Sequence, residues 1–256
     1  RYCKKRKKET QFRNDIPGSD FMGKFYKRNK TKISRRRSTS IKIARARSEH
    51  PVIISEFFDL LDQAFKTAKV DVKNHSHGGR VFSIDETGYK SKIQTKGFLC
   101  PVGRPALVLA NSEGKTNFST LICGNALGEF YPPSVVYKGS NKSLPAGWVM
   151  NGPPGTTYNT TKSGWMDQER FLAWLRWFDE KLTEKQVERP VVVVMDGASS
   201  HISVDIVEEA REKNIVLVKL PPNSTHFLQA LDVGVFGPSK VKWEKLLNIF
   251  HARHVQ

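Results

Sequence analysis

The segment VVVVMDGASSH, residues 191–201, restricts the fold of this chain more than any other. Four valines followed by a methionine predict a β-strand that is buried on both faces, because a half-exposed strand would alternate apolar and polar residues. Such a strand belongs to a sheet with helices on both sides. The strand ends at Asp196, and a lone charge is too costly to bury without a partner. Asp196 is therefore expected either to cap the next helix or to bind a cation.

The rest of the chain predicts a group of strands and then alternating strands and helices. This order indicates an α/β fold with a mixed sheet that is flanked by helices. Residues 140–164 are rich in Gly, Pro, Asn, Ser and Thr, and they predict a loop. Helices are expected over 51–68, 166–182, 203–214 and a final stretch from about 232 or 237 to 253. The first of these begins with a proline, which is frequent at helix starts. Strands are expected over 81–85, parts of 96–138, 191–195 and 215–220.

The positive charge is concentrated near the N-terminus. The formal net charge is +17, and residues 1–50 hold 18 Lys and Arg against 4 Asp and Glu. Such clusters bind phosphates or act as nuclear import signals, which predicts DNA as a partner and the nucleus as the location. A solvated tail is the alternative. The candidate DNA-binding residues are Lys4, Lys5, Arg6, Lys7, Lys8, Lys27, Arg28, Arg35, Arg36 and Arg37.

The cysteine content and the hydropathy of the chain bear on its redox compartment and on whether it contains a membrane span. The three cysteines are widely spaced and odd in number, which favours a reducing compartment and argues against a disulfide framework or a zinc site. No apolar run approaches the roughly 18 residues of a membrane span. Aromatic residues at helical spacing in 19–28 predict a short basic helical segment before the larger domain.

Three aspartates stand beside small or turn-forming residues. Asp85 follows VFSI, Asp196 follows VVVVM, and Asp232 lies at the start of the last expected helix. The carboxyl ends of neighbouring strands lie close together in an α/β sheet, so Asp85 and Asp196 could share a pocket that Asp232 completes. Clustered carboxylates need cations, and Mg²⁺ or Mn²⁺ prefer oxygen ligands. Two such ions would serve phosphodiester chemistry. A turn or helix cap is the alternative for each aspartate.

Two further residues are candidates for supporting roles at this site. Glu86 follows Asp85, but consecutive strand residues point to opposite faces, so it is expected to support the site indirectly or to be structural, with direct metal ligation as the lesser alternative. His201 comes five residues after Asp196 and is expected either to contact substrate phosphate or to pack at the start of a helix.

Four stretches in order resemble the pogo/Tigger/Jerky group of Tc1-mariner-like transposases and their domesticated relatives. They are VFSIDETGY, NGPPGTTYNTTKSGWMDQERFLAWLRWF, VVVVMDGASSHIS and LVKLPPNSTHFLQALDVGVFGPSKVKWEKLL. The 35 residues between Asp196 and Asp232 suit the second and third acids of the DDE triad of that group. The resemblance covers about residues 75–250, and the segment around GSDFMGKFYKRN is more distantly similar to the end of a CENP-B-type helix-turn-helix region.

The resemblance implies an RNase H-like DDE endonuclease domain over 51–256, after a basic DNA-binding segment and linker over 1–50. It implies that Asp85, Asp196 and Asp232 are catalytic and hold two Mg²⁺ or Mn²⁺ ions. It also implies hydrolysis at transposon ends and transfer of the DNA end into target DNA. Because two ends must be paired, a homo-oligomer on DNA is expected, with no membrane partner.

Two positions depart from the pattern of that group. Ala198 stands where a histidine is frequent, and Ala230 stands where a proline often precedes the third acid. An active endonuclease and strand-transferase is therefore weighed against a domesticated, catalytically silent protein that binds DNA or chromatin. A general nuclease for RNA–DNA hybrids fits the fold but leaves the LPPNSTHFLQALDVGVFGP segment unexplained.

Overall fold

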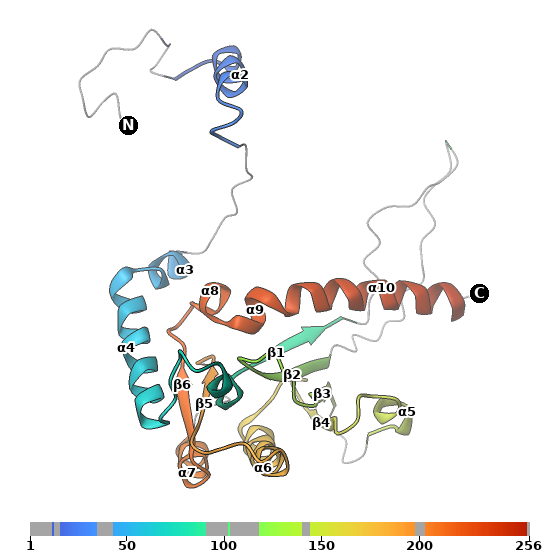
Figure 1. Cartoon of the computed structure of the whole chain (residues 1–256). Helices are drawn as coiled ribbons and strands as arrows, with labels where there is room; N and C mark the ends of the chain where they lie inside the picture. The colour runs from blue at the N-terminus through green and yellow to red at the C-terminus, as the bar shows by residue number, and fades with distance from the viewer. Residues whose placement is uncertain are drawn as a thin grey trace. The chain divides into compact units, whose positions relative to one another are not determined.

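The computed structural model describes residues 12, 16–34, 43–90, 102, 118–139, 144–197 and 203–254 (Figure 1). The chain divides into two compact units, residues 1–42 and 43–256. This division lies eight residues before the predicted boundary at residue 50. The difference arises because α3 (Ile43–Ser48) belongs with the larger unit: Ser48 is 3% exposed, and its hydroxyl lies 3.0 Å from the carbonyl oxygen of Asn223.

The smaller unit contains the helix α2 (Ser19–Arg28). It begins after Gly18 and contains four large apolar side chains at helical spacing, each of them at least 38% exposed: Phe21, Met22, Phe25 and Tyr26. The ring of Phe21 packs edge-on against that of Phe12, with centroids 4.8 Å apart. The predicted basic helical segment is therefore present, and no residue of α2 is buried within the described chain.

The larger unit is built on a six-stranded mixed sheet in the order β4-β3-β2-β1-β5-β6. β1, β2 and β3 form an antiparallel meander, β5 and β6 run parallel to β1, and β4 runs parallel to β3. This is the mixed α/β sheet flanked by helices that the sequence predicted. The strands are β1 (Val81–Tyr89), β2 (Phe118–Asn125), β3 (Ser134–Lys138), β4 (Thr157–Thr161), β5 (Val191–Met195) and β6 (Ile215–Lys219).

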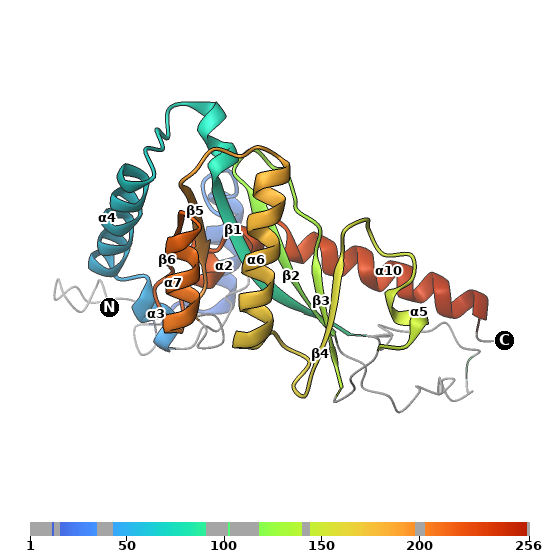
Figure 2. The same cartoon turned by 90° about the horizontal axis from the view of Figure 1, so that it is seen from below.

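Helices cover both faces of the sheet, and Figure 2 shows two of them, α6 and α7, side by side across it. One face packs against α6 (Gln168–Glu184) and α7 (Val204–Glu212) through a core that includes Phe82, Phe178 and Met195. The other face carries α4 (Pro51–Thr67) and the series α8 (Thr225–Leu228), α9 (Ala230–Gly234) and α10 (Phe236–His254). The remaining described helices are η2 (His75–Arg80) and α5 (Ala146–Val149).

The valine run has the environment that its composition predicts. Val191 and Val193 belong to the core beneath α6 and α7, whereas Val192 and Val194 pack in the core beneath α4. Val191, Val192 and Val193 have no exposed surface. β5 lies between β1 and β6, so both of its edges are paired and neither of its faces needs a polar side chain.

The predicted helices over 51–68 and 166–182 are confirmed as α4 and α6, with the side chain of Asp167 accepting a hydrogen bond from the backbone N–H of Arg170 at the start of α6. The predicted loop over 140–164 is wrong in part, because it contains α5 and β4. β4 forms where TYNTT pairs with β3 at the edge of the sheet. Its β-branched threonines suit a strand, and only that tertiary pairing reveals it.

Candidate active site

The first two predicted acids belong to neighbouring parallel strands: Asp85 lies within β1, and Asp196 directly follows the end of β5. β1 and β5 pair in the register Val81↔Val192, Phe82↔Val193 and Ser83↔Val194. Carried two residues further, the same register would bring Asp85 opposite Asp196, which directly follows the last residue of β5. Residues that are opposite one another in a parallel pair project from the same face, so both carboxylates are directed to one side of the sheet at the end of β5.

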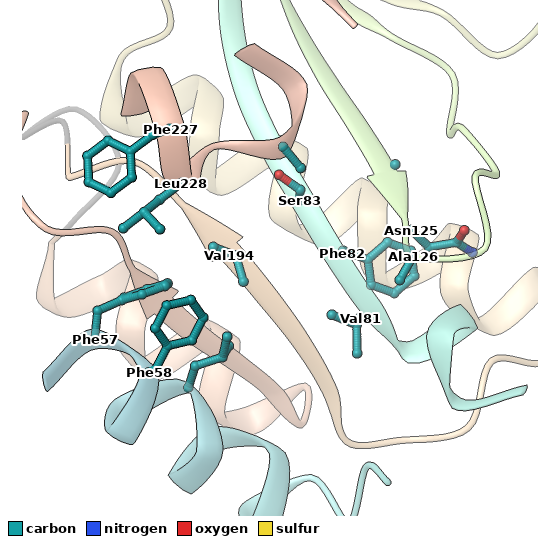
Figure 3. Close-up of a pocket in the computed structure, with 13 residues that line it drawn as sticks. Phe57, Phe58, Val81, Phe82, Ser83, Asn125, Ala126, Val194, Phe227 and Leu228 are labelled. Atoms are coloured by element: carbon teal, nitrogen blue, oxygen red, sulfur yellow. The ribbon is translucent and has the colours of Figure 1, made fainter. Parts of the chain in front are cut away.

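That side is the one covered by α4 and α8. Ser83 and Val194, two residues before the respective acids, line a pocket of about 390 Å³ together with Phe57 and Phe58 of α4 and Phe227 of α8 (Figure 3). Because strand side chains alternate between faces, Asp85 and Asp196 share the face that this pocket occupies. The acids therefore lie beyond the apolar pocket, toward the carboxyl end of β5.

The third acid is brought to the same face by α9. Asp232 lies in the first turn of α9 and is exposed to solvent. Three residues earlier, the fully buried Gln229 hydrogen-bonds to β1: its Nε2 donates to the carbonyl oxygen of Ile84 at 2.9 Å, and its Oε1 accepts from the hydroxyl of Ser83 at 2.8 Å. α9 thus begins in direct contact with the strand that carries Asp85.

The helix after Asp232 is also attached to β1. The hydroxyl of Tyr89 lies 2.6 Å from that of Ser239, and the indole N–H of Trp243 donates to the carbonyl oxygen of Lys90 at 2.9 Å. The ring of Trp243 meets that of Phe118 with centroids 5.4 Å apart. The segment that contains Asp232 is consequently held to β1 on both sides, by Gln229 before it and by Ser239 and Trp243 after it.

One expectation about Asp85 is wrong. The sequence predicted that its strand ends at this residue, but β1 continues to Tyr89 and Asp85 is its fifth residue. β1 continues because β2 pairs with it over its whole second half, with Asp85 opposite Ile122. It is β5 that ends at this level. Asp85 is 8% exposed, and its Oδ1 accepts a hydrogen bond of 2.8 Å from the backbone N–H of Glu86.

The donor set at this place suits a hard cation. Asp85, Asp196 and Asp232 offer oxygen ligands only, which is what Mg²⁺ and Mn²⁺ prefer. Within the described ranges, no three His, Cys, Asp or Glu side chains are gathered closely enough to hold a metal ion. The described side chains are therefore not gathered into a coordinating cluster, and the assignment of the three acids as metal ligands stays a prediction.

Glu86 projects from the opposite face, as alternation predicts. Its Oε1 accepts a hydrogen bond of 2.8 Å from the backbone N–H of Met166 and a second one from the hydroxyl of Ser119. That hydroxyl also lies 2.9 Å from the carbonyl oxygen of Gly164. Glu86 thereby joins β1 and β2 to the segment that leads into α6.

The predicted DNA-binding residues are only partly within the described chain. Lys27 and Arg28 lie in the last turn of α2 and are exposed. The others lie outside the described residues: Lys4, Lys5, Arg6, Lys7, Lys8, Arg35, Arg36, Arg37 and the supporting candidate His201.

Ser83 and Gln229 are the site residues that sequence reasoning did not single out. Ser83 is the one polar side chain among the first four residues of an otherwise apolar strand segment, and Gln229 precedes Asp232 by three residues. Neither feature by itself is enough to predict a role at the site. Their pairing joins residues that are 146 positions apart, so only the tertiary structure reveals it.

Comparison with known families gives one match to a family model. The model described as DDE superfamily endonuclease matches residues 115–249, which is more than half of the chain. The matched segment includes Asp196 and Asp232 and begins after Asp85.

Two curated relatives are similar over part of the chain. A protein of Cochliobolus lunatus named MFS-type transporter clz9 is 30% identical over 177 residues, or 68% of this chain and 19% of that protein. The human Pogo transposable element with KRAB domain is 24% identical over 135 residues, or 53% of this chain and 21% of that protein. The chain spans about a fifth of the length of each relative. In the described ranges, no helix combines the length and the apolar character needed to cross a membrane.

Among solved structures, the Mos1 transposase paired-end complex with left transposon end is similar at a TM-score of 0.46 and 12% identity. That similarity covers 98% of this chain and 88% of the Mos1 chain.

Proposed function

Because the chain belongs to the DDE superfamily endonuclease family, we propose that it is a transposase-type DNA endonuclease and strand-transferase. The reaction would hydrolyse phosphodiester bonds at the ends of a DNA element and transfer the released end to target DNA. Asp85, Asp196 and Asp232 would be its catalytic residues.

A single observation carries this proposal: the parallel register of β1 and β5, which would bring Asp85 opposite Asp196 if it continued two residues past Ser83↔Val194. The strands pair from Val81↔Val192 to Ser83↔Val194, so only two more residues in the same register separate this ladder from the two acids. Two carboxylates at one level of one sheet face repel each other unless a cation lies between them. The attachment of α9 to β1 through Gln229 supports the third acid at the same face.

These three aspartates would hold two Mg²⁺ or Mn²⁺ ions. The ions would supply charge neutralisation at the phosphodiester and activation of the attacking oxygen. The protein's own part is to fix the acids on a rigid strand pair: β5 is buried on both faces, and β1 is paired on both edges up to Ser83. A rigid scaffold matters because ligand positions must be held to a fraction of an ångström.

DNA is the proposed partner, and the nucleus the proposed location. The +17 charge and the cluster of basic residues in 1–50 favour phosphate binding. Lys27 and Arg28 present two of these charges on the surface of α2. Pairing of two DNA ends would require more than one copy of the chain.

A domesticated protein that binds DNA without cutting it is the second candidate. Two substitutions motivate it, Ala198 and Ala230 in place of the His and Pro of similar transposases. Ala230 is the first residue of α9, where a proline would preset the helical backbone. α9 forms with alanine at this position, so this departure does not prevent the helix that carries Asp232. Ala198 lies outside the described residues.

The test compares the wild-type protein with Asp196→Asn and with the control Asp59→Asn, which removes an exposed acid from α4. Mn²⁺ binding is measured by calorimetry, and nicking of supercoiled plasmid is measured on the same samples. We expect the wild type and Asp59→Asn to bind Mn²⁺ and to nick DNA, and Asp196→Asn to do neither. Binding without nicking in the wild type would favour the domesticated protein. Equal Mn²⁺ binding by all three would refute the triad.

A further inference from the structure

Gln229 is a buried amide whose two ends both contact β1. It has no exposed surface, and its orientation is determined by its partners: only its Nε2 can donate to the carbonyl oxygen of Ile84, so Oε1 is the atom that accepts from Ser83. A methionine or leucine would fill a similar volume. A buried hydrogen-bonded amide adds little net stability over such a side chain, but it specifies direction and register.

The position of this amide relates all three acids to one another. The ladder between β1 and β5 ends with the pair Ser83↔Val194, and Gln229 donates to the next residue of β1. Asp85 follows that acceptor directly. Asp232 is three residues after Gln229, within the first turn of α9, so a short length of backbone connects each acid to the hydrogen-bonded pair.

The backbone of Gln229 also joins α8 to α9. Its N–H donates to the carbonyl oxygen of Thr225 at 3.1 Å, and its carbonyl oxygen accepts from the N–H of Val233 at 3.1 Å. A shift of Gln229 along β1 would therefore move the end of α8 and the first turn of α9 together. Asp232 would move with them.

We propose that Gln229 and Ser83 form a positioning pair, which sets the place of Asp232 relative to Asp85 and Asp196. This inference rests on the proposed function, because it assigns the third metal ligand its location. Gln229 is fully buried and hydrogen-bonded to β1, so the pair would act through Asp232 as positioning residues. The pair is a long-range contact between β1 and the start of α9, and it does for the third acid what strand register does for the other two.

Four substitutions distinguish a loss of positioning at Asp232 from a general loss of folding stability. Gln229→Met keeps the volume and removes both hydrogen bonds. Ser83→Ala removes one of them, whereas Ser83→Thr keeps the hydroxyl and can place its extra methyl in the neighbouring pocket of about 390 Å³. Phe171→Leu is the control, since it weakens the core under α6 on the other face of the sheet.

Two measurements are made on each variant of the full chain: the Kd for Mn²⁺ by calorimetry, and amide hydrogen exchange over residues 230–234 and 191–195. We expect Gln229→Met to raise the Kd for Mn²⁺ by roughly 10- to 100-fold, as loss of a residue behind a metal ligand does elsewhere. Ser83→Ala should give a smaller increase, and Ser83→Thr should restore the wild-type value. Exchange should become faster over 230–234 and remain slow over 191–195.

The comparison is made between Gln229→Met and Phe171→Leu when the two variants have the same melting temperature. If their Kd values for Mn²⁺ are then equal, the positioning role is overturned. If Gln229→Met does not fold, the comparison of Ser83→Ala with Ser83→Thr decides. If the wild type binds no Mn²⁺, the proposed function fails and exchange decides on the pair: faster exchange confined to 230–234 supports it, and uniform or unchanged exchange refutes it.

Discussion

Asp196→Asn tests the two strand acids most directly, because asparagine keeps the size of the side chain and removes one charge. Adjacent strands lie about 4.8 Å apart, so two carboxylates at the same level of one face are about 5 Å apart. Two like charges at that distance repel by about 1 kcal/mol in water, and by about 3 kcal/mol at an effective dielectric constant of about 20. Asp196 is only half-buried, so the lower value applies.

The metal-free variant should therefore be more stable than the wild type by about 1 kcal/mol. For a domain of this size, that raises the melting temperature by about 2–4 °C. Such a gain is the usual result when a site holds like charges together for function.

Mn²⁺ should reverse the order of the two melting temperatures. At about 100 times its Kd, a ligand that binds only the folded state adds about 2.7 kcal/mol to the free energy of unfolding. The wild type should gain this stabilisation, and Asp196→Asn should gain little of it. Differential scanning calorimetry in chelator and in Mn²⁺ measures both effects, with Asp59→Asn as a control that should show the wild-type shift.

The opposite outcome is an Asp196→Asn variant that melts below the wild type in chelator and still shows the full Mn²⁺ shift. That result would mean that Asp196 neither repels Asp85 nor binds the ion, and it would return Asp196 to the role of a helix cap.

Three further predictions concern the scaffold. Arg80→Met should lower the free energy of unfolding by about 3 kcal/mol in urea, because the buried guanidinium donates to two carbonyl oxygens at 2.5–3.2 Å; a change below about 1 kcal/mol would contradict this. Phe178→Ala should lower it by about 3–5 kcal/mol, since this ring has no exposed surface. Burial raises the pKa of Tyr131 to about 12, so its phenol should stay protonated in the folded state while the unfolded state ionises near pH 10. Stability should fall as the pH rises between these values, and Tyr131→Phe should lessen that fall.

The sequence alone predicted the features that depend on local pattern. The valine run specified a strand buried on both faces, and Pro51 with the apolar spacing after it specified α4. The apolar spacing in 166–182 specified α6. The three aspartates were candidates for a related reason, since each stands in a short motif that can be read along the chain. All of these signals come from residues within a few positions of one another.

Only the tertiary structure decided how these parts meet. β1 runs on past Asp85 because β2 pairs with it, and β4 forms because β3 offers it an edge. The parallel register of β1 and β5 sets Ser83 opposite Val194, two residues before Asp85 and Asp196. The hydrogen bonds of Gln229 span more than 140 residues. Strand pairing and buried polar contacts depend on which segments come together in space. A pattern of neighbouring residues does not show which distant segments will pair.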